Sequence, residues 1–149
     1  MSQSFDFKRA PGHLIRRAQQ FAVAVFMEEA AGFDITPVQY AILNALIDSS
    51  GIDQVSLAAC VAFDAATSGS VIGRLEAKGW VRREADQGDR RRKLLWITPE
   101  GRRTVRAMQC AAEQAQSRML APLDPRERAE FMRLLDKLIA GHEQGASAT

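Results

Sequence analysis

The sequence predicts a mainly α-helical fold with one small β-hairpin, an α+β protein formed as a single domain over residues 1–149. Two observations lead to this fold class. Apolar residues recur three and four positions apart over most of the chain, which is the spacing of one helix face. Only the stretch from residue 81 to residue 97 departs from that spacing, with two strand-like runs on either side of a polar turn.

Clear start and stop signals separate six helical segments. Thr36 is followed at once by a proline and three residues later by a glutamine, which together predict a capping box. Ser56 is expected to cap a short helix, and residues 63–64 to make the turn into the next helix, which Gly79 ends. The predicted helices cover about 11–32, 37–48, 57–61, 65–78, 99–120 and 125–140.

The hairpin carries the densest run of positive charge in the chain. Its strands are predicted at Val81–Ala85 and Lys93–Ile97, and its turn at 86–89 is followed at once by four cations at 90–93. Four cations at a hairpin tip repel one another unless an anionic partner lies against them. Duplex DNA, with one charge per ~1.7 Å of helix axis, is the partner that this tip favours. A basic hairpin directly after a helix indicates a winged helix-turn-helix.

The predicted head, about residues 36–98, contains three helices and the β-hairpin wing. Helices from both ends of the chain flank it, at about 11–32 and 99–140, and a flexible tail is expected at 141–149. So small a head leaves apolar surface on the flanking helices uncovered. We therefore expect these to act as dimerisation helices, which pack together and against a second copy of the chain.

The net charge of +2 hides an uneven distribution. Residues 74–106 hold eleven Lys and Arg against five Asp and Glu, a balance of +6, whereas the rest of the chain has a balance of −4. A basic middle between acidic ends indicates a local anionic partner rather than general adhesion to anions.

Several classes of protein do not fit the sequence. No apolar run approaches the ~18 residues of a membrane span and no secretory leader is evident, so a cytoplasmic protein without membrane contact is expected. Two cysteines and two histidines give neither a disulfide framework nor a metal cluster. There is no glycine-rich phosphate loop and no nucleophile motif, so we expect no enzymatic activity and no cofactor.

Four segments resemble the multiple-antibiotic-resistance-regulator (MarR) family in its order and spacing: Ile35–Leu43, Arg74–Arg83, Asp89–Arg91 and Leu95–Gly101. The resemblance covers about residues 11–140. It implies a dimeric winged-helix repressor whose terminal helices form the dimer and whose DNA affinity is relieved by a small anionic aromatic ligand. Pro11–Arg17 resembles a narrower subgroup that controls the catabolism of aromatic acids such as nicotinate.

The helix at 65–78 is the candidate recognition helix. Its first two turns carry only small residues, so its backbone can enter a major groove about 12 Å wide. Thr67, Ser68 and Ser70 are candidates for contacts with base edges, and Arg74, one turn further, for contact with a phosphate or a guanine of a pseudo-palindromic operator. The alternative is a small-residue helix packed inside the head.

In the wing, Arg90 and Arg91 are expected to follow the minor groove, where a narrow A·T-rich stretch concentrates negative potential. Arg92 is expected to face phosphate or solvent. Phosphate repels Asp89; the Asp-x-Arg pattern of the resembled family implies that Asp89 orients Arg91 through a charge-assisted hydrogen bond. The alternative for the whole run is a solvated charged surface.

The first predicted helix carries a candidate effector site. His13, Arg16 and Arg17 fall on one polar face, where grouped cations suit the carboxylate of a small aromatic acid. Gln39 and Tyr40, at the start of the second helix, are candidates for a hydrogen bond and a stacking edge. The alternative is a solvated helix face with an ion pair.

Two other functions are compatible with the same fold. A redox-responsive regulator would sense oxidants through a cysteine, but Cys60 and Cys110 lie among apolar residues and are expected to be buried structural thiols. A winged-helix protein-interaction module would use the hairpin as a docking edge. Salt distinguishes this second alternative, because several phosphate contacts impose a steep salt dependence on binding.

Overall fold

The computed structural model describes residues 5–62 and 65–146, so the predicted turn at residues 63–64 lies outside the described residues. The fold class is confirmed: helices dominate, and one small antiparallel sheet forms the wing. The elements in chain order are η1 (Phe7–Arg9), α1 (Pro11–Glu29), α2 (Pro37–Asp48), β1 (Ile52–Asp53), α3 (Gln54–Cys60), α4 (Ala65–Ala77), β2 (Val81–Ala85), β3 (Lys93–Ile97), α5 (Pro99–Met119) and α6 (Pro125–Ala146).

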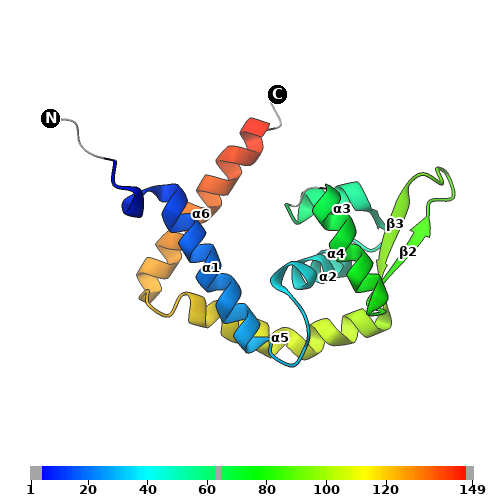
Figure 1. The fold of residues 1–149 in the computed structure, drawn as a ribbon, viewed down its shortest axis with the longest axis horizontal. Coiled ribbons are helices and arrows are strands. Elements are labelled where there is room, and N and C mark those ends of the chain that lie inside the picture. The colour runs from blue at the N-terminus through cyan, green and yellow to red at the C-terminus, as the bar shows by residue number, and fades with distance from the viewer. Residues whose placement is uncertain (1–4, 63–64, 147–149) are drawn as a thin grey trace.

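Helix α5 connects two parts of the molecule. Figure 1 shows α2, α3, α4 and the β2–β3 hairpin gathered around one end of α5, while α1 lies along its other end and α6 leads away from it. Arg118 near the end of α5 forms ion pairs with Glu28 and Glu29 of α1, each at 2.7 Å. The N-terminal helix is thereby packed against a helix from the C-terminal half.

Local signals set the helix starts as expected. The Thr36 hydroxyl accepts a hydrogen bond from the Gln39 backbone at 3.2 Å, while the Thr36 backbone donates to the Gln39 side chain at 3.2 Å. These two bonds confirm the predicted capping box. Asp124 and Glu127 make the same reciprocal pair at the start of α6, at 2.9 Å each. Gly79 ends α4 with a φ of +75°, which a residue without Cβ adopts at no steric cost.

Three details differ from the prediction. The sheet has three strands, in the order β1-β3-β2, because the two residues of β1 pair with Leu94 and Leu95 of β3. Asp53, not Ser56, is the N-cap of α3, and its carboxylate accepts from the Ser56 backbone at 2.9 Å. Residues 141–146, predicted as a flexible tail, are helical; a glycine costs a helix only about 1 kcal/mol and does not have to end it.

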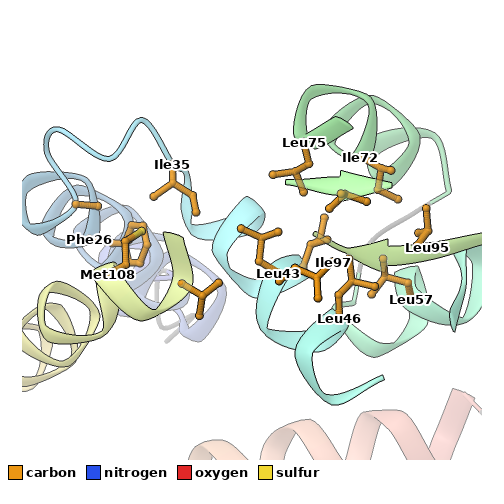
Figure 2. Packing of buried hydrophobic residues seen from close by; sticks show 14 of the residues in the cluster. Phe26, Ile35, Leu43, Leu46, Leu57, Ile72, Leu75, Leu95, Ile97 and Met108 are labelled. Atoms are coloured by element: carbon orange, nitrogen blue, oxygen red, sulfur yellow. The ribbon is translucent and has the colours of Figure 1, made fainter. Parts of the chain in front are cut away.

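The core joins the head to the flanking helices α1 and α5. Leu43, Leu46 and Leu57 meet the sheet residues Leu95 and Ile97 inside the head, and all five side chains are buried (Figure 2). Phe26 of α1 and Met108 of α5 form the other end of the same cluster, with Ile35 between the two groups (Figure 2). The orientation of the head relative to α1 and α5 is therefore set by apolar packing.

Much apolar surface remains uncovered on α1 and α6. No described residue of α6 is buried, and its large apolar side chains are exposed except for Leu135, which is half-buried. The exposed apolar residues of these two helices are Leu14, Ile15, Phe21, Val23, Met27, Phe131, Met132, Leu134, Leu138 and Ile139. None of the helices within residues 5–62 and 65–146 has the length and hydropathy that a bilayer crossing requires.

Candidate nucleic-acid interface

Helix α4 presents a small polar face to solvent. Thr67, Ser70 and Arg74 are exposed, and their spacing of three and four residues places them on one side of the helix. Ser68 is only 1% exposed, so the prediction that it contacts base edges is wrong. The reason is the helical repeat: Ser68 lies on the same face as Ile72 and Leu75, which are fully buried in the head.

The wing tip holds two cations free to meet an anion. Arg90 and Arg91 are exposed, and neither has an acidic partner within the part of the chain that the structure describes. The Asp89 carboxylate accepts a hydrogen bond from the Arg91 backbone at 3.1 Å. Asp89 therefore shapes the backbone of the tip, which corrects the expectation that it orients the Arg91 side chain.

Arg92 forms ion pairs within the protein. Its guanidinium donates to Asp53 at 2.8 Å and lies 3.5 Å from the carboxylate of Asp86. The hydrogen bond from Arg92, followed by that from the Ser56 backbone, holds the pKa of Asp53 well below its usual range, and the same bond to Asp53 raises the pKa of Arg92. Arg92 therefore faces solvent, as one of its two predicted alternatives, with its side chain 54% exposed, while two carboxylates hold its guanidinium.

Other cations around the head are also paired. Arg82 lies 2.6 Å from Glu84, and Arg83 lies 2.9 Å from Glu76 of α4. Such exposed pairs are weak, so they hold the side chains near the surface without removing their charge. The wing and α4 thus present exposed positive charge, and Arg74, Arg90, Arg91 and Lys93 are the cations of these elements for which the described residues provide no ion pair.

Two of the predicted effector residues line one cavity. His13 and Arg17 border a space of about 590 Å³, together with Phe7, Leu14 and Phe21. The Arg17 guanidinium lies over the Phe21 ring, 5.3 Å from its centre, and the Phe7 and His13 rings are 4.7 Å apart. The cavity thus combines a cation with aromatic surface.

Arg16, the third predicted residue on this helix face, lies beside the same cavity. Its Nη2 is 3.4 Å from Nδ1 of His13, although Arg16 itself does not line the space. Arg16 therefore contacts the predicted effector site through the histidine ring.

Gln39 and Tyr40 lie elsewhere. Gln39 is 5% exposed and borders a second cavity, of about 530 Å³, while the Tyr40 ring packs 5.7 Å from that of Phe26. The prediction that both join His13 and Arg17 is wrong for a single chain. Phe26 follows His13 by thirteen residues of one helix, which separates them by roughly 20 Å at 1.5 Å per residue.

Two residues of structural importance were absent from the sequence-based site. Lys78 at the end of α4 bonds to the backbone and carboxylate of Asp34, and its ammonium lies 4.7 Å from the centre of the Trp80 ring. Asp53 joins the wing to α3, as the Arg92 bond shows. Only the spacing of Asp53, three residues before a serine, signals its capping role in the sequence.

The cysteines also correct an expectation. Cys60 and Cys110 are both exposed, not buried, because each lies on the outer side of its helix. The argument from burial against an oxidant-sensing regulator therefore fails, since an exposed thiol meets one of the two requirements for reactivity.

A helix with a small polar outer face beside a basic hairpin is the DNA-reading arrangement of a winged helix-turn-helix protein, and these features define the class of this chain. Residues 33–92 match the MarR family. The chain belongs to the MarR family of DNA-binding transcriptional regulators, and it is therefore not an enzyme.

Similar proteins cover nearly the whole chain. The HTH-type transcriptional repressor NicR of Pseudomonas putida is 32% identical over 139 residues, which are 93% of this chain and 88% of NicR. The transcriptional regulator HosA of Escherichia coli is 33% identical over 127 residues, 85% of this chain and 93% of HosA. A structure of Bordetella bronchiseptica BpsR, whose DNA binding is regulated by 6-hydroxynicotinic acid, superposes with a TM-score of 0.87 at 33% identity, over 93% of this chain and 99% of BpsR.

Proposed function

We propose that this chain forms a homodimeric repressor that binds a pseudo-palindromic operator and is released by a small aromatic carboxylate of the nicotinate or benzoate type. The observation that carries the proposal is the Arg90–Arg91 tip, which has no ion pair among the described residues, beside the exposed Thr67–Ser70–Arg74 face of α4. These two surfaces suit contacts with the minor groove and the major groove, respectively.

The uncovered apolar faces of α1 and α6 support a dimer. Ten large apolar side chains are exposed on these two helices, and exposed apolar surface of this kind marks sites of protein association. A two-fold axis through these helices would place two copies of α4 side by side. Copies that contact successive major grooves lie about 34–36 Å apart, so the dimer geometry controls DNA affinity.

The cavity at His13 and Arg17 supports the effector. Arg17 can form a charge-assisted pair with a carboxylate, and Phe7 and Phe21 can stack on an aromatic ring. The cavity lies on a proposed dimerisation helix. A ligand that binds more tightly to one dimer geometry would therefore shift the spacing of the two α4 helices. The regulation of BpsR by 6-hydroxynicotinic acid supports the choice of ligand class.

Fluorescence anisotropy with DNA from upstream of the protein's own gene tests the proposal. Scrambled competitor DNA, two salt concentrations, and nicotinate- and benzoate-type acids form the arms of the experiment. We expect sequence-selective binding with a steep salt dependence that one acid releases. Selective binding that none of the acids releases would overturn the effector, and unselective binding would overturn the operator-binding repressor.

Alanine at Arg17 is expected to weaken release by the acid while leaving DNA affinity unchanged, because the side chain lines the cavity and not the DNA-facing surface. The acid concentration for half-release should rise at least about tenfold, the effect of removing a charge-assisted pair. The same direction is expected for Arg16, through His13. Arg126→Ala, which removes an exposed cation from α6, is the matched control. Weakened DNA binding in Arg17→Ala would contradict the assignment.

Aspartate at Leu134 and Leu138 is expected to convert the dimer into a monomer, because both side chains are about half exposed on α6 and would be buried between copies. Light scattering after size exclusion gives the mass. Val55→Asp alters the most exposed apolar residue of α3 and should leave the mass unchanged. A double variant that remains dimeric would show that α6 does not form the dimer interface.

A further inference from the structure

Arg92 connects two parts of the head that the sheet joins only weakly. Strand β1 pairs with β3 through just two residue pairs, Ile52 with Leu95 and Asp53 with Leu94. The hairpin itself is registered only as far as Ala85 and Lys93, so the tip at residues 86–92 extends beyond the ladder. A two-stranded hairpin is marginally stable alone. Further contacts must therefore hold the tip at a defined angle to α3 and α4.

Arg92 closes the base of the tip. Its backbone carbonyl accepts from the Asp86 backbone at 2.9 Å, and its guanidinium lies 3.5 Å from the Asp86 carboxylate. Asp86 in turn accepts from the Gly88 backbone at 3.0 Å. Both ends of the tip are therefore tied to Arg92.

Asp53 connects Arg92 to the helix-turn-helix. One carboxylate oxygen accepts from the Ser56 backbone at 2.9 Å and so caps α3; the other accepts from the Ser56 hydroxyl at 2.7 Å and from Arg92 at 2.8 Å. The side chain of Asp53 is 13% exposed and that of Arg92 is 54% exposed, so the protein shields the carboxylate of this pair from solvent but not the guanidinium. The pKa of Asp53 lies well below its usual range, so the carboxylate remains charged wherever DNA binding would be measured.

We infer that Arg92 is a positioning residue that braces the wing against the N-terminus of α3, through Asp53, and so holds Arg90 and Arg91 at the angle that DNA requires. This inference rests on the proposed DNA interface. Without the brace, the tip would sample more orientations when free. Binding would then carry the entropic cost of ordering it in each of the two subunits.

Asp53→Asn separates this role from simple electrostatics. Asparagine is as good an N-cap as aspartate, so α3 should keep its start, but the neutral side chain no longer holds Arg92 by charge. Removing a negative charge near DNA should strengthen binding if only the net charge matters. The brace predicts the opposite sign: operator affinity roughly tenfold weaker, from two loosened tips per dimer. A melting temperature and a helical circular dichroism spectrum equal to those of the wild type establish that the fold is intact.

The salt dependence of operator binding by Arg92→Ala gives a second, independent test of the inference. If Arg92 bound a phosphate directly, its removal would lower the slope of log affinity against log salt by about 0.9 per phosphate. The brace predicts weaker binding with an unchanged slope. Arg91→Ala is the matched control, since it removes the neighbouring cation and should lower the slope.

The outcomes distinguish the inference from the proposed interface. Asp53→Asn binding as tightly as the wild type, or more tightly, would overturn the brace, and so would a lowered slope for Arg92→Ala. An unchanged slope for the Arg91→Ala control would instead overturn the wing contact itself. A weaker Asp53→Asn variant together with an unchanged Arg92→Ala slope would support the brace.

Discussion

Gly101→Ala is expected to destabilise the protein by about 3 kcal/mol, the upper end of the cost of overpacking a core. Gly101 is buried in the first turn of α5. A Cβ there would lie 2.4 Å from the backbone carbonyl oxygen of Trp80 and 2.8 Å from Cγ1 of Ile97. A backbone carbonyl cannot rotate away as the end of a flexible side chain can, so α5 must shift from the start of β2.

Hydrogen bonds at this contact between the start of α5 and Trp80 also hold the wing to α5. The Thr98 backbone donates to the Trp80 carbonyl at 3.0 Å, and the Thr98 hydroxyl donates to the Gly79 carbonyl at 2.6 Å. A shift of α5 would disturb both bonds as well as the packing of Ile97, which is why the upper end of the range is expected.

Thermal unfolding, monitored by circular dichroism, measures the loss of stability in Gly101→Ala. A loss of about 3 kcal/mol corresponds to a fall in melting temperature of roughly 6–12 °C for a chain of this size. Gly73→Ala is the control, because a Cβ at this position in α4 meets no atom within 4 Å. It should be neutral or stabilising by up to about 1 kcal/mol, the helix propensity gained. Equal melting of Gly101→Ala and wild type would refute the steric argument.

Simultaneous replacement of Arg90 and Arg91 by alanine is expected to weaken operator binding at least about a hundredfold, because a dimer would lose four exposed cations from its two wing tips. The slope of log affinity against log salt should fall by about 3–4 if all four cations displace counterions from DNA. The fold should be unaffected, since neither side chain has an ion pair within the described residues.

Anisotropy titrations at several salt concentrations measure both effects. Lys8→Ala with Arg9→Ala is the matched control, titrated without acid because Lys8 borders the same cavity as His13 and Arg17. It also removes two adjacent exposed cations, but from η1, far from the wing (Figure 1). The control should bind operator DNA like the wild type. If the two double variants lost affinity equally, net charge rather than the wing would explain binding.

Features that depend on residues close together in the sequence were predicted correctly, whereas features that depend on distant residues were not. The capping box at Thr36 and the helix end at Gly79 depend on residues within four positions of each other, so they were visible in the sequence and the structure confirms both. The two-residue strand β1 was missed because it is too short for a pattern, and only its pairing with β3 defines it.

The candidate site shows the same division. The sequence identified the wing and the helix that precedes it, but not which of their side chains remain free. Ser68 could have been excluded from its spacing to Ile72 and Leu75, which shows it to be on the core face. The pairing of Arg92 with Asp53 could not have been found, because 39 residues separate them.

The sequence by itself determined the winged helix-turn-helix class, the family, the order of the helices and the position of the basic wing, because caps, turns, periodicity and charge runs are local properties of the chain. The tertiary structure decided which cations are held by carboxylates, which thiols are exposed, and that His13 and Arg17 line one cavity while Gln39 lines another. These outcomes depend on contacts between segments far apart in sequence, which form only when the head, α1 and α5 pack together.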